Sequence, residues 1–263
     1  MPKRKKKIDK PPPEGAEVKL IGEKLAKLVG IRKLVAVVPM NGRYVKKPIF
    51  GLEDMTPHLP TKVIGVGVKG KLIFWILSND HFLLNTLGMT GTWSGQHSIH
   101  ARVRFDFDSG GPAYFVDTRN FGSLKFVYGR NSFKRKLDEL GPDMLSEPIT
   151  YPQFAERLDA KSHWPICKAL MDQRVIAGVG NYVKSESLYR AKISPHRLVG
   201  SLSGTELNDL MREIQSVLRE AYEKPNSDRF LVYRKKTDPI GNPITSEMTK
   251  DGRRTHWVPA IQM

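Results

Sequence analysis

The spacing of apolar residues along the chain predicts a strand-rich part followed by a helical part. Between residues 17 and 28 the apolar positions fall at helical spacings, which predicts a first helix. Short β-branched or aromatic runs, broken by Gly, Asn-Asp or Ser-Gly-Gly turns, then predict strands at 34–38, 63–68, 72–77, 100–107 and 113–116. A series of strands without intervening helices is typical of a β-sandwich or barrel.

From about residue 132 the pattern becomes helical. Helices are predicted at 151–158, 165–171, 183–190 and 205–222. The last is the clearest, because Ser203 and Glu206 form a capping-box pattern ahead of a single apolar stripe. After Pro225 short strand-like pieces return, which predicts a terminal hairpin. We therefore expect an α+β protein: a basic disordered tail (1–12), a β-sandwich domain with a flanking helix (13–131), a helical domain (132–226) and a β-hairpin (227–263).

Composition and charge indicate a globular protein that binds polyanions. Among 263 residues, 43 Lys+Arg outnumber 27 Asp+Glu and give a net charge of +16, which favours nucleic acid above other partners, although ribosome-associated and acidic-membrane proteins share this property. The single cysteine, Cys167, excludes an internal disulfide and a multi-cysteine zinc site, so we expect an intracellular protein. No apolar run approaches the ~18 residues of a membrane span. The KRKKK run at 3–7 is a nuclear address if the source is eukaryotic, a basic arm for phosphates, or a solvated tail.

Five sequence motifs carry the functional information. Residues 170–188 read LMDQRVIAGVGNYVKSESL, in which a GVGN turn precedes a predicted helix and could bring backbone N–H groups to an anion; a tight interhelical turn explains the GxGN equally well. Four more strings occur in order: LGMTG (87–91), DTRNFG (117–122), LGPDML (140–145) and GRRTHWVP (252–259). Together they resemble the formamidopyrimidine-DNA glycosylase/endonuclease VIII family, and the chain is identified as a member of it.

The resemblance implies a helix–two-turn–helix (H2TH) domain and a C-terminal finger, but this finger departs from the bacterial pattern. Family cysteines are expected near Ile240, in the turn after it, at Val258 and at Ile261, and none is present. Without thiolates there is no soft tetrahedral zinc site, so we expect no metal and no cofactor. The finger is then similar to the zincless finger of certain endonuclease VIII-like enzymes, held by packing of Ile240, Trp257, Val258 and Ile261.

The same resemblance implies roles for residues that contact DNA. Met89, Arg119 and Phe121 match the residues that fill the hole left by a flipped-out nucleotide, where an apolar wedge and a planar cation replace lost stacking. Either Met89 or Phe121 taken alone would be read as ordinary core. Asn120 stands where many members have a second arginine. The candidates for phosphate contacts are Asn181, Lys161, Arg254 and His100.

Two cations are candidates for the strand-cleavage chemistry. Lys71, in VKGKLIFW, matches a hairpin lysine that points at the scissile nucleotide. Lys69 is the other candidate for this role. The alternative without a catalytic role is that Lys71 is a solvated lysine at a strand end. Arg253 matches the finger arginine that binds the phosphates beside the lesion and assists the second elimination. The adjacent Arg254 is the alternative.

PEGAEV at 13–18 resembles the catalytic opening of the family, P-E-G-P-E-V, displaced inward by twelve residues. In the family a terminal proline attacks C1′ as a secondary amine, and the adjacent glutamate transfers protons. Pro13 is internal, and its amide nitrogen cannot form a Schiff base. Three possibilities stay open. The tail is removed after Pro12; another group replaces the amine (Pro2, Lys71 or a Glu14-activated water); or catalysis has been lost.

The implied function is that of a bifunctional DNA glycosylase and AP lyase of base excision repair, with Pro13, Glu14, Lys71 and Arg253 as catalytic residues. The segment between Tyr222 and Tyr233 lacks the long loop that covers a flipped purine in 8-oxoguanine-specific members, which favours oxidised pyrimidines and ring-opened or hydantoin lesions. The rival functions are non-catalytic binding of damaged or abasic DNA and general binding of nucleic acid. The expected partner is damaged double-stranded DNA, with single-stranded DNA left open, no membrane and a monomeric state.

Overall fold

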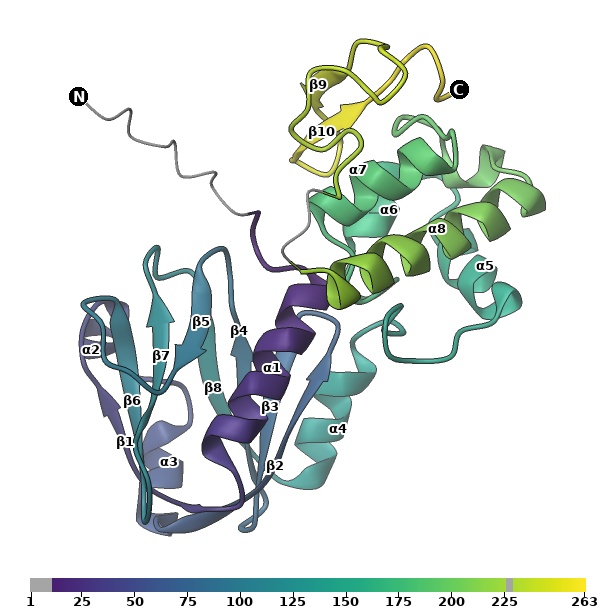
Figure 1. Cartoon of the computed structure of the whole chain (residues 1–263). Helices are drawn as coiled ribbons and strands as arrows, with labels where there is room; N and C mark the ends of the chain where they lie inside the picture. Colours follow the sequence, from purple (N-terminus) through teal and green to yellow (C-terminus); the bar gives the residue numbers. More distant parts are fainter. Residues whose placement is uncertain (1–10, 226–228) are drawn as a thin grey trace, which may run out of the picture.

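The computed structural model describes residues 11–225 and 229–263 (Figure 1), so the KRKKK run and Pro2 lie outside the described residues. Its strand-rich part is an antiparallel sheet in the order β5-β7-β6-β1-β2-β3-β4-β8. The strands are β1 (Lys33–Pro39), β2 (Thr61–Lys69), β3 (Leu72–Leu77), β4 (His81–Thr86), β5 (Gly91–Ser94), β6 (Ala101–Phe107), β7 (Ala113–Asp117) and β8 (Ser123–Tyr128). Short helices α2 (Arg43–Lys46) and α3 (Leu52–Met55) and the 3₁₀ turn η1 (Thr56–His58) connect β1 to β2.

This sheet folds into the two layers of a β-sandwich. The corner lies between β1 and β2, where only two residue pairs are in register, Lys33 with Lys62 and Leu34 with Thr61. Aromatic side chains fill the space between the layers: Trp75 of β3 is fully buried and its ring centroid lies 5.2 Å from that of Phe105 on β6. The predicted sandwich is therefore confirmed.

Three strands were not predicted from the sequence, and for one of them, β4, burial explains why. Five of the six residues of β4 are buried, so the strand shows no polar–apolar alternation. The strands β3 and β6 were predicted from aromatic or β-branched runs between turn residues, and the structure shows alternating burial along both. Of the other two strands that were not predicted, β5 begins at Gly91, the last residue of LGMTG, and β8 begins directly after DTRNFG.

The helical part is built around a buried central helix. Its elements are α4 (Arg130–Asp138), α5 (Tyr151–Asp159), α6 (Ile166–Met171), α7 (Asn181–Arg190), η2 (Val199–Ser201) and α8 (Gly204–Glu223). Helix α7 is buried from Tyr182 to Leu188, so even its polar residues lie inside the protein. The capping box predicted for α8 is confirmed: Ser203 Oγ accepts from Glu206 N (3.2 Å), and Glu206 Oε2 accepts from Ser203 N (2.7 Å).

Helix α1 (Gly15–Val29) joins the two parts, and Figure 1 shows it running from the sandwich to the end of α8. Its first turn contributes Ala16 to the helical core, whereas Val18 and Leu25 belong to the core of the sandwich. Near its middle, Glu23 accepts hydrogen bonds from the Tyr222 hydroxyl at 2.8 and 3.0 Å. The residues just before α1 are therefore fixed where the two parts meet.

The finger is the hairpin of β9 (Thr245–Met248) and β10 (Arg254–Trp257). The expectation that Ile240 packs into it is wrong, because this side chain is 77% exposed, although Val258 is fully buried. A carboxylate organises the turn instead. Asp238 Oδ1 accepts from the backbone N–H groups of Ile240 (3.1 Å) and Asn242 (2.8 Å), and Asp238 Oδ2 accepts from the Tyr189 hydroxyl of α7 (3.2 Å). The backbone N–H groups of this turn need hydrogen-bond acceptors, which a carboxylate supplies and an apolar side chain does not.

The C-terminal residues close the finger against the helical part. Gln262 Oε1 accepts from Val258 N at 2.7 Å, and Gln262 Nε2 donates to the Ile193 carbonyl at 2.9 Å. Among the described residues, no group of His, Cys, Asp and Glu side chains is arranged to hold a metal ion. In that same part of the chain, no helix is long and apolar enough to cross a membrane.

Candidate active site

Glu14 lies at the centre of the site, at the junction of the sandwich and the helical part. Its side chain is buried, and its carboxylate accepts two backbone hydrogen bonds from the first turn of α7, from Tyr182 N to Oε1 (2.8 Å) and from Val183 N to Oε2 (3.1 Å). From the sequence, the GVGN turn could either bring backbone N–H groups to an anion or serve only as a tight interhelical turn; in the structure these N–H groups bind the protein's own carboxylate. Glu14 N donates in turn to Glu17 Oε2 at 3.1 Å, which starts α1.

Glycines in the GVGN turn allow the close approach of Glu14. A Cβ on Gly180 would lie 2.2 Å from Glu14 Cδ, so any larger residue there would displace the carboxylate. Gly178 adopts φ +94°, a backbone conformation that favours glycine, and its carbonyl accepts from Gly15 N at 2.9 Å. The GxGN motif is therefore an internal contact surface for Glu14-Gly15, and the sequence did not identify this partner.

Lys71 approaches the same centre from the β2–β3 turn. Gly70 N donates to Asp143 Oδ2 at 3.0 Å, and a Cβ on Gly70 would lie 2.8 Å from Gly178 N, which places this turn against the GVGN turn. The rival Lys69 forms an ion pair with Glu147, Nζ to Oε1 3.0 Å. Geometry therefore favours Lys71 as the cation facing Glu14.

The electrostatics of Glu14 and Lys71 are linked. Burial raises the pKa of Glu14 from 4.5 to about 7, against the opposing influence of the Lys71 ammonium and the two α7 N–H bonds. Burial also lowers the pKa of Lys71, the Glu14 carboxylate opposes this change, and the Arg253 guanidinium adds to it. Glu14 can therefore hold or release a proton near neutral pH, and the amine of Lys71, whose pKa is lowered, lies beside it.

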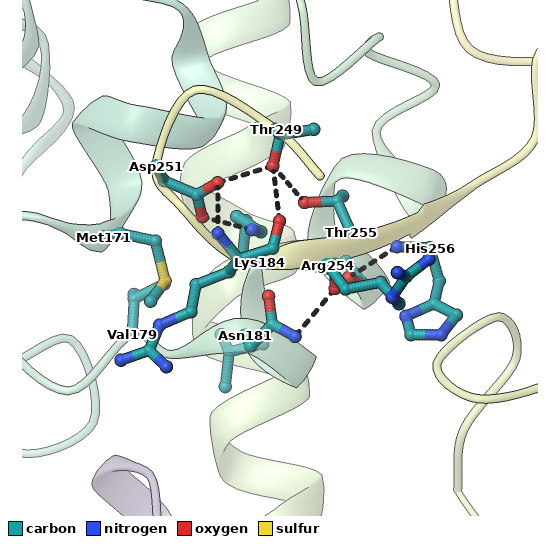
Figure 2. Close-up of polar contacts among 12 residues, drawn as sticks. Met171, Val179, Asn181, Lys184, Thr249, Asp251, Arg254, Thr255 and His256 are labelled. Atoms are coloured by element: carbon teal, nitrogen blue, oxygen red, sulfur yellow. Dashed lines mark hydrogen bonds and ion pairs between the residues drawn. The ribbon is translucent and has the colours of Figure 1, made fainter. Parts of the chain in front are cut away.

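Arg253 enters the site from the finger. It is exposed, in the turn that precedes β10, and it is close enough to Lys71 to lower the lysine pKa. The neighbouring Arg254 is also exposed, but its guanidinium donates to the Ser246 carbonyl of β9 at 3.0 Å. Asn181, the first residue of α7, donates from Nδ2 to the Arg254 carbonyl at 3.0 Å (Figure 2). The phosphate candidates Asn181 and Arg254 are thus brought together.

The candidates for filling the DNA void lie on two loops joined by Asp117. Asp117 Oδ1 accepts from the Thr90 hydroxyl at 2.5 Å, Asp117 Oδ2 accepts from Gly122 N at 2.7 Å, and Thr90 Oγ1 accepts from Arg119 N at 2.9 Å. A Cβ on Gly88 would lie 2.8 Å from Gly122 N. The LGMTG and DTRNFG loops are therefore locked side by side.

The side chains on these loops have the exposure that a DNA contact requires. Phe121 is 55% exposed, and the Arg119 guanidinium carbon lies 4.8 Å from its ring centroid. Met89 is half-buried, so it is neither core nor fully solvated. Asn120 adopts φ +59°, a left-handed conformation that asparagine tolerates better than most residues, including the arginine of many members.

Of the remaining sequence candidates, His100 and Lys161 belong to other parts of the structure, whereas Pro13 adjoins Glu14. His100 is half-buried ahead of β6, and its carbonyl accepts from Asp117 N at 3.0 Å, so it borders the DTRNFG loop. Lys161 lies in the turn after α5, with Nζ 4.6 Å from the Trp164 ring centroid. Pro13 is half-buried beside Glu14, and its nitrogen is part of a peptide bond to Pro12.

Two carboxylates that shape the site were not assigned from sequence. Asp143 of LGPDML binds the Lys71 turn through Oδ2 and Leu145 N through Oδ1, at 3.0 and 2.9 Å. Glu186 of the SES run accepts backbone hydrogen bonds from 231–233 at 2.7–3.0 Å and so fixes the chain entering the finger. Gly70 lies 73 positions from Asp143, and residues 231–233 lie 45–47 positions from Glu186, so no local pattern reveals these pairs.

Comparisons with known proteins place most of the chain in one family. Three family models match: the formamidopyrimidine-DNA glycosylase N-terminal domain at 12–124, its H2TH domain at 140–230 and its C-terminal domain at 224–263. A formamidopyrimidine-DNA glycosylase of Thermus thermophilus is 32% identical over 224 residues, 76% of this chain and 82% of the relative. One of Shouchella clausii is 29% identical over 275 residues, 95% of this chain and 99% of the relative.

Solved structures show the same fold. The crystal structure of the MutM (Fpg) protein from Thermus thermophilus superposes with a TM-score of 0.83 at 29% identity, covering 95% of this chain and 98% of that one. Lactococcus lactis Fpg, non-covalently bound to DNA containing an AP site, gives a TM-score of 0.83 at 24% identity, with 95% and 99% covered. Fold and site define a DNA glycosylase of base excision repair. The chain belongs to the formamidopyrimidine-DNA glycosylase family.

Proposed function

We propose that this protein is a bifunctional DNA glycosylase and AP lyase that excises oxidised bases from double-stranded DNA and cuts the strand by β,δ-elimination. The observation that carries the proposal is the position of Glu14: a buried carboxyl with a pKa of about 7, flanked by Lys71 and approached by the finger arginine Arg253. Such a carboxyl suits proton transfer at neutral pH, and the two cations suit phosphates on either side of a flipped nucleotide.

In the proposed reaction an amine attacks C1′ of the damaged nucleotide. The new N–C1′ bond replaces the glycosidic bond, the base leaves with the bonding electron pair and takes up a proton, and the attacking amine loses one, so the protons balance. Glu14 donates its proton to the opening deoxyribose ring oxygen, and the resulting Schiff base undergoes β- and then δ-elimination. Arg253 binds the phosphate leaving groups, and Lys71 binds phosphate or transfers a proton. Met89, Arg119 and Phe121 replace the extruded nucleotide in the stack.

The amine is supplied by Pro13 when residues 1–12 are absent. In the intact chain this nitrogen is a tertiary amide with no proton and a delocalised lone pair, so it cannot attack C1′. The same observation favours a second candidate function: the intact chain binds damaged or abasic DNA without cutting it. The position of Pro13 beside Glu14 supports the first function for the trimmed chain.

Borohydride trapping tests the proposal. Intact protein and a chain that begins at Pro13, released from a cleavable fusion, are incubated with a thymine-glycol duplex and borohydride. The trimmed chain is expected to give a covalent DNA adduct and base release, and its Glu14→Gln variant is expected to give neither. An intact chain that binds the lesion tightly without adduct supports the binding function for that form. Absence of adduct and of base release from both forms contradicts the enzymatic proposal.

Substrate preference is the finer part of the proposal. Only a short segment joins α8, which ends at Glu223, to the chain that Glu186 fixes at 231–233, so there is no long loop to cover a flipped purine. This supports an endonuclease VIII-like preference for oxidised pyrimidines and ring-opened or hydantoin lesions. Excision of thymine glycol is expected to be faster than excision of 8-oxoguanine from otherwise identical duplexes under single-turnover conditions. The reverse order contradicts it.

A further inference from the structure

A buried ion pair joins α7 to the turn of the finger. Lys184 Nζ lies 2.5 Å from Asp251 Oδ2, and the two side chains are 0% and 1% exposed. Lys184 belongs to the buried central helix, and Asp251 lies between β9 and β10, two residues before Arg253. Figure 2 shows the lysine side chain meeting the aspartate beneath the finger hairpin. None of the roles assigned above uses either residue.

Stability alone does not explain such a pair. Removing two charges from water costs several kcal/mol per ion, and well-packed apolar residues of similar volume often serve a protein equally well or better. What an ion pair supplies that an apolar contact does not is a fixed direction, because its hydrogen bonds require defined geometry. The direction of the Asp251 carboxylate is therefore the property that the pair determines.

The second oxygen of that carboxylate organises the turn that carries Arg253. Asp251 Oδ1 accepts from the Thr249 hydroxyl at 2.5 Å and from Arg253 N at 3.4 Å. Thr249 N donates to the Arg253 carbonyl at 3.0 Å, and the Thr249 hydroxyl lies 2.6 Å from that of Thr255 (Figure 2). One carboxylate thus connects Lys184 on α7 with the backbone of Arg253.

Helix α7 holds both halves of the proposed active site at consecutive residues. The N–H groups of Tyr182 and Val183 bind the carboxylate of Glu14, and the next residue, Lys184, binds Asp251. The positions of Glu14 and of the Arg253 turn are therefore both set by the same helical turn. The finger has no cysteine at the positions where family members bind zinc. The Lys184–Asp251 contact therefore fixes the finger hairpin relative to Glu14.

We propose that Lys184 and Asp251 are positioning residues that orient Arg253 toward the DNA phosphate at the Glu14–Lys71 centre. The proposal rests on the function proposed above. It predicts that the contribution of Arg253 to DNA binding depends on the pair, whereas the stability of the fold does not depend on the pair's charge.

A double-mutant cycle tests this in the full chain. The probe is a fluorescent duplex with a tetrahydrofuran abasic-site analogue, whose binding requires no nucleophile. Arg253→Ala is expected to weaken binding about tenfold, the loss of one charge-assisted phosphate contact. Lys184→Met/Asp251→Leu is expected to weaken it by a similar factor with an unfolding midpoint close to that of the native chain, and the triple variant is expected to show no further loss.

A matched control removes a different ion pair from the same helix. Arg190 of α7 pairs with Glu220 of α8 at 2.7 Å, away from the finger, so Arg190→Met/Glu220→Leu is expected to lose nothing beyond what stability accounts for and to add independently to Arg253→Ala. Should Lys184→Met/Asp251→Leu not fold, Thr249→Val keeps the ion pair and removes the hydroxyl bond, and is expected to be non-additive with Arg253→Ala.

Two results would overturn the inference: native affinity in the folded Lys184→Met/Asp251→Leu variant, or full additivity of Thr249→Val with Arg253→Ala. Failure of the proposed function is read separately, from the native chain. If the native chain binds the abasic analogue no better than undamaged duplex, the damage-specific function is wrong, while the coupling of Arg253 to the pair is still measured on the undamaged duplex.

Discussion

Oε1 of Glu14 accepts a 2.8 Å hydrogen bond from the backbone N–H of Tyr182, across 168 positions of sequence. This bond joins the entry to α1 with the N-terminus of α7, and it buries the carboxyl between the two parts of the protein. Because the site is made at this contact, changes at Glu14 affect chemistry, proton binding and stability together, and the three effects are separable by experiment.

Glu14→Gln is expected to abolish proton transfer while leaving the shape of the site nearly unchanged. In the chain that begins at Pro13, base excision is expected to fall about a hundredfold or more, the usual contribution of a general acid. Binding of the tetrahydrofuran duplex is expected to stay within a few-fold of the native value. Single-turnover excision and fluorescence anisotropy measure the two quantities, and equal losses in both would contradict the role of Glu14 as an acid.

The raised pKa of Glu14 makes stability depend on pH. The folded protein binds this proton up to about pH 7, whereas the unfolded chain releases it near 4.5, so the free energy of unfolding falls as pH rises between these values. From pH 5 to pH 8 the native chain is expected to lose about 2–3 kcal/mol more than Glu14→Gln. Urea unfolding at both pH values measures the difference, and parallel profiles would show that Glu14 titrates normally.

Lys71 holds down the pKa of Glu14, so its removal is expected to move the pH dependence of excision. Without the ammonium the carboxyl keeps its proton to higher pH, and the alkaline limb of the single-turnover rate in Lys71→Met shifts upward. Lys69→Met is the control, because Lys69 is paired with Glu147. A shift of equal size in both variants would mean that general charge, and not Lys71, sets the profile.

Phe121→Ala is expected to change recognition of damage but not the fold. The ring is 55% exposed, so the free energy of unfolding is expected to change by about 0.5 kcal/mol at most. Loss of one stacking contact is expected to weaken binding of the abasic analogue about tenfold. Phe50→Ala, at a 68% exposed phenylalanine outside the two loops, provides the comparison. Equal effects of the two substitutions on binding would contradict the proposal that Phe121 fills the void left by the flipped nucleotide.

The finger turn is expected to depend on Asp238 and not on a metal ion. Asp238→Ala leaves two backbone N–H groups and the Tyr189 hydroxyl without their acceptor, which is expected to cost about 2 kcal/mol or more. Asp209→Ala, at an exposed aspartate of α8, is expected to be neutral. Thermal unfolding with and without EDTA completes the test, since a lower midpoint in EDTA would indicate a bound metal.

Local patterns were sufficient where one segment carries its own signal. The amphipathic stripe and the Ser203–Glu206 pair defined α8, and aromatic or β-branched runs bounded by turn residues defined β3 and β6. The pattern failed at β4, which is buried on both faces, and at Ile240, where a turn required a hydrogen-bond acceptor. At both positions the structure depends on the three-dimensional environment, and the pattern of residues adjacent in sequence carries no signal for that environment.

The sequence by itself determined the family, the order of the domains and the chemical types at the site: a glutamate after proline, a hairpin lysine, a finger arginine and two motif loops. Only the tertiary structure decided that the anion at the N-terminus of α7 is Glu14, that Lys69 belongs to Glu147, and that Lys184 reaches Asp251. The physical reason is that the burial, pKa and hydrogen-bond partners of a side chain depend on its three-dimensional environment, which forms only when segments distant in sequence pack together and exclude water.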